Sequence, residues 1–274
     1  MTAAPALLAP GPTRVVGILN VTPDSFSDGG RYTDVEVAVE HGMQLATEGA
    51  ALVDVGGEST RPGAPRVDVE AELARVLPVV SGLAERGVAV SVDTMRAEVA
   101  RQCVEAGAVV VNDVSGGLAD PHMLRTVASL GCLYVAMHWR GHSARMLERA
   151  TYDDVVAEVV DELLARVKAA VVAGVEPDRL VLDPGLGFAK NAEQSWEVLR
   201  GVEAIHGIGL PVLWGASRKG MLDAVAPGGP LARDDASVAI TTWLATHGAW
   251  AVRTHTVAPH VAAAAVASKL GRRP

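Results

Sequence analysis

Side chains that can bind anions or hydrogen-bonding ligands follow short apolar segments throughout the chain. Carboxylates accept paired hydrogen bonds, amides donate and accept them, and cationic side chains bind anions. Arg253 and His255 are two residues apart, so on a strand they point the same way and form a candidate anion site. The polar residues that end apolar segments are Asn20, Asp54, Asp93, Asn112, Asp113, His138, Asp183, Ser217, Arg218, Lys219, Arg253 and His255.

The apolar segments themselves have the composition of buried parallel strands, because they are rich in Val, Ile and Leu on both faces. The carboxyl ends of such strands meet at one mouth of a barrel, where the polar side chains would converge. The segments are Val15–Asn20, Ala51–Gly56, Val88–Asp93, Ala108–Asp113, Cys132–His138, Arg179–Asp183, Leu210–Gly215 and Ala249–His255.

Helical patterns separate these segments. Thr33 and Glu36 have the spacing of a capping box, and Asp120-Pro121 has the form of a helix start. An apolar stripe runs from Val155 to Val167, and Gly174 then provides a stop. The alternation predicts an α/β fold, a single-domain (β/α)8 barrel over residues 14–274 after a flexible leader at 1–13, with an open doubly wound sheet as the alternative.

Composition limits the partners of the protein. A formal net charge of -8 over 274 residues argues against general affinity for nucleic acid or anionic membranes. Cys103 and Cys132 cannot form a disulfide framework, and no apolar stretch of about 18 residues could span a bilayer. We therefore expect a cytoplasmic protein. The histidines and cysteines lack zinc-site spacing.

The motifs around the polar residues resemble those of dihydropteroate synthases, in family order and from about Val15 to the C-terminus. The resemblance implies a transferase that joins a dihydropterin-methyl pyrophosphate to 4-aminobenzoate, with pyrophosphate leaving first. Binding, orientation and charge stabilisation would then carry the rate. The motifs are NVTPDSFSDGG, GGESTRPGA, SVDT, NDVSGG, DPGLGFAK, GASRKGML and the closing Arg253-Thr254-His255.

For the pterin, the resemblance implies a site at the strand ends. Asp183 would accept the paired donor edge of the ring, and Asn112 and Asp93 would bind along the same edge. Lys219 would meet a ring carbonyl or nitrogen, and Met137 would lie against the ring. Alternation turns Asp113 away if Asn112 points inward. Lys190 is interpreted as part of a surface ion pair and is left out of the site.

For the other ligands, the resemblance assigns Arg253 and His255 to pyrophosphate and counts Thr254 among the substrate-binding residues. Lys219, Arg253 and His255 form the expected catalytic set. Asn20 would hold Mg2+ against the pyrophosphate. Phe26 and Phe188 would help to wall the aminobenzoate pocket. The residues expected to contact aminobenzoate and the adjoining pyrophosphate are Thr60, Arg61, Pro62 and Ser217.

Two alternatives share the pterin site, namely a pterin-dependent corrinoid methyltransferase and a non-catalytic pterin-binding homologue. Both should lack part of the loop motifs or the anion site, which are all present here. Thr256 and Trp214 depart from the usual family residues. The resemblance also implies a homodimer formed through helices late in the barrel.

Overall fold

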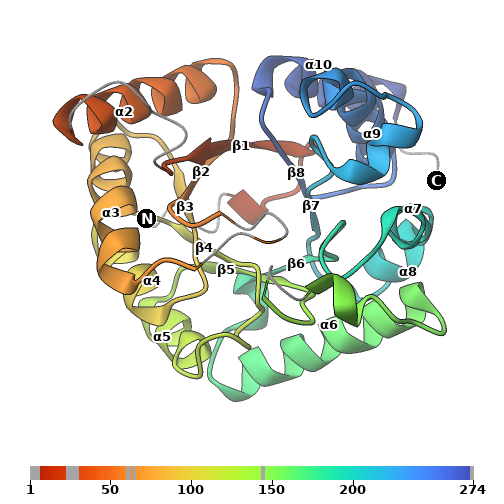
Figure 1. Cartoon of the computed structure of the whole chain (residues 1–274), viewed down its shortest axis with the longest axis horizontal. Helices are drawn as coiled ribbons and strands as arrows, with labels where there is room; N and C mark the ends of the chain where they lie inside the picture. The colour runs from red at the N-terminus through yellow and green to blue at the C-terminus, as the bar shows by residue number, and fades with distance from the viewer. Residues whose placement is uncertain (1–6, 23–30, 60–62, 64–65, 143–145, 272–274) are drawn as a thin grey trace.

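The structure is a computed structural model and describes residues 7–22, 31–59, 63, 66–142 and 146–271. Parallel strands form one eight-stranded sheet in the order β6-β5-β4-β3-β2-β1-β8-β7. A parallel bridge between Leu182 and Val212 joins the two ends of this order. Figure 1 looks into the resulting ring of strands, with the helices around its outside. The predicted single (β/α)8 barrel is confirmed, and the open sheet is wrong.

The strands match the predicted segments to within a few residues at each end. Their bounds are β1 Arg14–Asn20, β2 Leu52–Gly56, β3 Val90–Asp93, β4 Val110–Asp113, β5 Leu133–Met137, β6 Leu180–Asp183, β7 Leu213–Trp214 and β8 Ala251–Thr254. The helices are α2 Arg31–Thr47, α3 Val69–Glu85, α4 Ala97–Glu105, α5 Met123–Leu130, α6 Val155–Val172, α7 Ala192–Arg200, α8 Val202–His206, α9 Asp234–Thr246 and α10 Val257–Leu270. Short 3-10 turns are η2 Met146–Arg149, η3 Pro177–Arg179, η4 Gly220–Ala224 and η5 Leu231–Arg233.

Side-chain alternation along the strands separates two apolar layers, because successive strand residues face opposite sides. On β5, for example, Leu133 and Val135 belong to the inner layer and Tyr134 to the outer one. The outer layer packs against the helices. The inner layer fills the barrel with Val16, Leu52, Val110, Leu133, Val135, Val181, Leu213, Trp250 and Ala251.

The helices confirm the predicted apolar stripes better than the predicted start signals. On α6 the residues Val155, Val159 and Leu163 are buried. Helix α2 begins at Arg31, so the prediction that Thr33 caps it is wrong. Asp120 serves two helices: its Oδ1 accepts from the backbone N–H of His122, the N-cap residue of α5, and its Oδ2 accepts from that of Ala97 at the start of α4. Among the described residues, no helix is long and apolar enough to cross a membrane.

Part of the segment assigned to a leader lies under the barrel. Leu7 and Leu8 pack against the inner apolar layer, and the indole of Trp250 donates to the Leu7 carbonyl at 2.8 Å. Thr13 donates its hydroxyl to the Ala249 carbonyl at 2.7 Å. Residues 7–13 therefore contribute to the floor of the barrel, at the end opposite the polar strand ends.

Packing between α2 and α3 depends on a glycine. A Cβ added at Gly42 would lie 2.7 and 2.9 Å from the two methyl carbons of Leu83, which is fully buried. Helix propensity alone favours Ala over Gly by about 1 kcal/mol. Overpacking of a close-fitting core costs about 1–3 kcal/mol, and here it should win because Leu83 has no open space to move into.

We therefore predict that Gly42→Ala lowers the free energy of unfolding, measured by urea denaturation. In a Leu83→Ala background the clash is absent, so the same substitution should be neutral or stabilising. A destabilisation of equal size in both backgrounds would show that contact with Leu83 is not the cause.

Candidate active site

Polar side chains form the last inward layer of the barrel at the carboxyl ends of its strands. Two-residue alternation places Asp54 above Leu52, Asn112 above Val110 and Asp183 above Val181 on their strands. The pattern continues on β8, where Arg253 follows Ala251. The structure thus brings together Asp93, Asn112, Asp183 and Arg253, as the sequence predicts.

Arg253 links two buried carboxylates from neighbouring strands. Its Nε lies 2.6 Å from Asp54 Oδ2, and one terminal nitrogen lies 2.8 Å from Asp93 Oδ2. Asn112 Nδ2 also donates to Asp54 Oδ2, at 3.0 Å. Burial raises the pKa of Asp93, against the opposing effect of the Arg253 charge. Two carboxylates thus share the single guanidinium of Arg253, so Arg253 is already paired and does not form a free anion site.

Asp54 is the residue that the predicted site omitted. It is 1% exposed, and its Oδ1 atom has no hydrogen-bond partner among the described residues. The signal in the sequence was its polar side chain near the end of an apolar segment; in the structure Asp54 lies on β2, in register with Ser91 of β3. What the sequence did not reveal is that Asp54 accepts from both Arg253 and Asn112.

Asp183 interacts with Gly185 and Lys219, which come from separate loops. Its Oδ1 accepts from the backbone N–H of Gly185 at 2.7 Å, which fixes the carboxylate plane. Burial raises its pKa, while hydrogen bonding and the charges of Lys219 and Arg253 oppose this rise. The Lys219 ammonium lies 4.2 Å from the centre of the Phe188 ring. Burial lowers the pKa of Lys219 to about 8, with the Asp183 charge acting in the other direction.

His255 is held as a neutral ring. Its Nδ1 lies 3.0 Å from Ser217 Oγ, and Ser217 Oγ accepts the backbone N–H of His255 at 3.2 Å. With the Ser217 hydroxyl as the donor to Nδ1, the ring proton resides on Nε2. Burial, followed by repulsion from Arg253 and Arg218, lowers the pKa of His255 to about 3. A neutral N–H donor is therefore available near Arg253.

Thr254 lies behind this pair rather than in the site. It is fully buried, and its hydroxyl lies 3.3 Å from Ser217 Oγ and 3.4 Å from the Thr256 carbonyl. Alternation along β8 turns Thr254 to the side opposite Arg253. The described geometry supports a role for Thr254 in holding Ser217, rather than a contact with a ligand.

Asn20 ends β1 with an exposed side chain. A Cβ added at Gly56 would lie 3.8 Å from both Asn20 Oδ1 and Asp93 Oδ2, so the glycine leaves space between these oxygens. An amide oxygen beside open space suits a hard cation whose remaining ligands are phosphate oxygens and water. No group of three or more His, Cys, Asp or Glu residues able to hold a metal occurs in the described part of the chain.

Two loops, which follow β1 and β2 and carry the motifs NVTPDSFSDGG and GGESTRPGA, are described only in part. Phe26, Thr60, Arg61 and Pro62 lie outside the described residues. The ends of the second loop converge on Arg96, which donates to the Glu58 carboxylate at 2.9 Å and to the Val67 carbonyl.

A buried carboxylate completes the attachment of the second loop. Glu72 of α3 accepts from the same Arg96 guanidinium and, at 2.6 Å, from the Thr94 hydroxyl. Thr94 follows Asp93 directly, so one guanidinium ties both ends of the loop to the end of β3.

Met137 belongs to a small apolar cluster at the mouth. It is 2% exposed and packs with Met95 and Val114, with Phe188 and Trp139 at the edge. The cluster places Phe188 and Met137 on the same side of the site as Asp183, which pairs with Met137 in the register of β5 and β6.

Three further residues clarify the limits of the site. Asp113 points to the helix side, as alternation predicts, and accepts from Ser115 and the Tyr134 hydroxyl. Trp214 also points outward, where its indole donates to His206 Nε2 at 3.1 Å, so this departure from the family pattern does not touch the site. The interpretation of Lys190 as a surface residue is wrong, because Lys190 is 2% exposed.

Comparison with known proteins agrees with this arrangement. The profile of the family described as pterin binding enzyme matches residues 16–255. A dihydropteroate synthase from Mycobacterium leprae is 53% identical over 253 residues, which covers 90% of this chain and 89% of the relative. The dihydropteroate synthase of Escherichia coli K12 is 43% identical over 244 residues, covering 89% and 86%.

Solved structures give the same result. A dihydropteroate synthase from Xanthomonas albilineans with 4-aminobenzoic acid superposes with a TM-score of 0.90 at 45% identity, covering 97% of this chain and 95% of that one. A second structure from that organism, in complex with 7,8-dihydropteroate, has a TM-score of 0.86 at 42% identity and covers 97% and 96%. With the matched profile, the full-length relatives and the strand-end cluster in agreement, the chain belongs to the dihydropteroate synthase family of pterin-binding enzymes.

Proposed function

We propose that the chain is a transferase that condenses a 7,8-dihydropterin-6-ylmethyl diphosphate with 4-aminobenzoate, giving 7,8-dihydropteroate and diphosphate. The carbon–oxygen bond to diphosphate breaks, a carbon–nitrogen bond to the arylamine forms, and the amine loses one proton. The observation that carries this proposal is the inward layer at the strand ends, where Asp93, Asn112 and Asp183 lie with the cations Arg253 and Lys219.

In this proposal the pterin binds among the carboxylates. Asp183, already oriented by the Gly185 N–H, accepts the paired donors of the ring, and Asn112 and Asp93 bind along the same edge. Lys219 meets a ring carbonyl or nitrogen, and Met137 lies against the ring face. Charge on Asp183 also stabilises positive charge that develops on the pterin as diphosphate leaves.

The diphosphate occupies the side of the site near β8. Arg253 presents part of its guanidinium there, and the Nε2–H of His255 adds a neutral donor. Asn20 would hold Mg2+ against the phosphate oxygens, where the bound ion would neutralise charge on the leaving group. The aminobenzoate contacts are assigned to Ser217, Phe188 and the loop residues Thr60, Arg61 and Pro62.

The proposed reaction also indicates where the protein works and what it binds. Both substrates are small molecules, and nothing in the proposal requires nucleic acid or a membrane. Cys103 and Cys132 are free, buried thiols, which is consistent with a reducing cytoplasm.

The proposed reaction is tested with the purified protein, the pterin diphosphate and 4-aminobenzoate, with and without Mg2+. We expect Mg2+-dependent formation of dihydropteroate. Asp183→Asn should weaken binding of the free pterin alcohol by about tenfold or more, since a charged hydrogen bond is worth about 1.5–3 kcal/mol.

Exposed Asp161→Asn on α6 is a matched control and should change neither result. Pterin binding without product would support the non-catalytic homologue instead. Unchanged affinity in Asp183→Asn would remove Asp183 from the pterin site.

Lys219 should make ligand binding depend on pH. Its pKa of about 8 lies below the ordinary value for Lys, so the free site loses this charge as pH rises through about 8. An anionic ligand favours the ammonium, so above pH 8 binding must take up a proton and should weaken, by up to about tenfold per pH unit. Calorimetry of the pterin diphosphate between pH 6 and pH 9.5 measures this slope.

Lys219→Gln removes the titrating charge, so the slope above pH 8 should disappear along with part of the affinity. The exposed Lys168→Gln on α6 should retain the slope of the original protein. A slope that persists in Lys219→Gln would mean that another group carries the pH dependence.

We also propose a homodimer formed through late elements of the barrel. Large apolar side chains are exposed there, with Leu231 at 72%, Leu270 at 71% and Val225 at 63%. Light scattering should give about twice the chain mass of 28.4 kDa, and Leu231→Glu combined with Leu270→Glu should shift the mass towards one chain. A monomer mass for the unmodified protein would contradict this arrangement.

A further inference from the structure

Lys190 is a buried cation that the proposed reaction does not use. Its Nζ atom lies 2.8 Å from His138 Nδ1 and 3.2 Å from the carbonyl oxygens of Gly185 and Phe188. An ammonium has three N–H donors, so these contacts use all of them. Burial lowers the pKa of Lys190 to about 7. The side chain is therefore fixed in place and has no donor left for a ligand.

The contact with His138 continues to the surface helix α6. Since His138 Nδ1 accepts from the ammonium, the neutral ring carries its proton on Nε2, which lies 2.9 Å from Glu162 Oε2. Burial and the nearby Lys190 charge lower the pKa of His138 to about 4, so the ring stays neutral near pH 7. One series of contacts thus runs from the loop after β6 to α6 through Lys190, His138 and Glu162.

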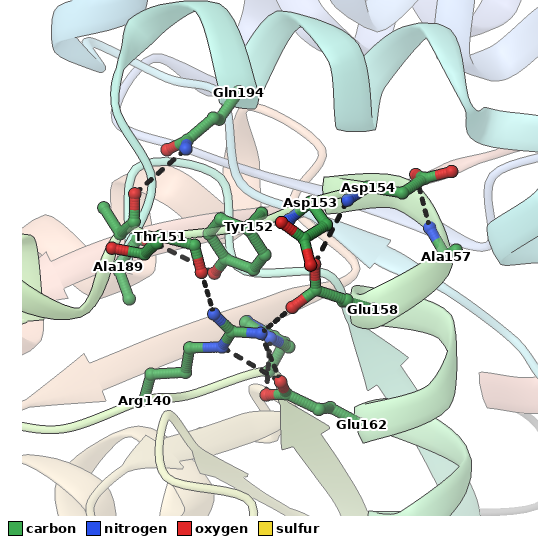
Figure 2. A network of polar contacts seen from close by, with 12 residues as sticks. Arg140, Thr151, Tyr152, Asp153, Asp154, Ala157, Glu158, Glu162, Ala189 and Gln194 are labelled. Carbon is green, nitrogen blue, oxygen red and sulfur yellow. Dashed lines mark hydrogen bonds and ion pairs between the residues drawn. The ribbon is translucent and has the colours of Figure 1, made fainter.

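A second set of contacts supports the same loop from outside. Figure 2 shows Arg140 between Glu158 and Glu162 of α6 and beside the ring of Tyr152. The Tyr152 hydroxyl donates to the Ala189 carbonyl at 2.9 Å. Ala189 has a φ of 47°, a left-handed conformation that its neighbours must hold in place.

The loop that Lys190 holds is also the loop that orients the site. The two carbonyls that it binds belong to Gly185, whose N–H donates to Asp183, and to Phe188, whose ring faces the Lys219 ammonium. Gly185 packs closely on β5, because a Cβ there would lie 2.7 Å from the His138 carbonyl oxygen. The position of this loop therefore sets both a carboxylate and a cation of the site.

We propose that Lys190 is a positioning residue for the pterin part of the site. By joining His138 at the end of β5 to the loop 184–190, it fixes the orientation of Asp183 and the contact between Phe188 and Lys219 without touching the ligand. This inference rests on the proposed pterin site and adds to it a residue that acts through other residues.

The test compares Lys190→Met with the unmodified protein. Methionine has a similar length but no donor, so the loop carbonyls lose their shared partner. We expect the dissociation constant of the free pterin alcohol to rise by about tenfold to one-hundredfold, as for loss of hydrogen bonds to a charged group. The KM for 4-aminobenzoate should also rise, because Phe188, whose carbonyl Lys190 binds, is assigned to the aminobenzoate pocket. Exposed Lys168→Met is the matched control and should bind the pterin normally.

A purely structural role would reduce the folded fraction but leave the dissociation constant of the folded protein unchanged. Calorimetry normalised to the number of binding sites separates these two results. If Lys190→Met does not fold, a pair of His138 variants gives the same test. His138→Asn keeps an acceptor near the Nδ1 position and should retain pterin affinity, whereas His138→Leu should lose it.

Each outcome has a distinct meaning. If the unmodified protein does not bind the pterin alcohol, the proposed function fails. If it binds, and Lys190→Met or His138→Leu binds equally well, the positioning role of Lys190 is wrong. A smaller folded fraction with an unchanged dissociation constant would show a purely structural role and would also overturn the inference.

Discussion

Alternation of side chains along closed parallel strands is the constraint on which this site depends. Every second side chain enters an interior that is closed below by an apolar layer, so polar groups are accommodated only in the last layer before solvent. Asp54, Asn112 and Asp183 each stand two residues above an inner apolar side chain. The same constraint sends Asp113 to the other side, where Ser115 and Tyr134 satisfy it.

Charged side chains that lie in one buried layer need partners of opposite charge. Buried carboxylates are expensive unless they are paired and hydrogen-bonded, and Arg253 meets this need for Asp54 and Asp93 together. A ligand entering the site with a donor edge and an anionic group would therefore exchange partners with groups that are already oriented. Such preorganisation reduces the rearrangement needed during a reaction in which charge separates.

The sequence was sufficient for the architecture because strand composition and alternation are local properties. It was weaker where the outcome depended on distant partners. Asp120 accepts from His122 at the start of α5, as its local form suggests, but its second bond, to Ala97 of α4, joins residues that are distant in sequence. Lys190 was assigned to the surface because no local pattern reveals that His138, 52 residues away, would accept from its ammonium.

Asp54 and Thr254 illustrate the same limit within the site. Both stand at strand ends, yet Asp54 proves to be the shared acceptor of Arg253 and Asn112, while Thr254 supports Ser217 from behind. Position along a strand gives the side on which a residue lies. Whether it meets a ligand or another side chain depends on contacts between strands.

Two neutral histidines hold the site from opposite sides. His255 connects Ser217 to the region of Arg253, and His138 connects Lys190 to α6. Burial lowers their pKa values to about 3 and about 4, so neither ring changes its charge near neutral pH. The groups that titrate near that range include Asp93 and Lys190, each with a pKa of about 7, and Lys219, with a pKa of about 8. The two histidines thus connect parts of the mouth without changing charge, whereas Lys190, which positions the loop after β6, titrates near neutral pH.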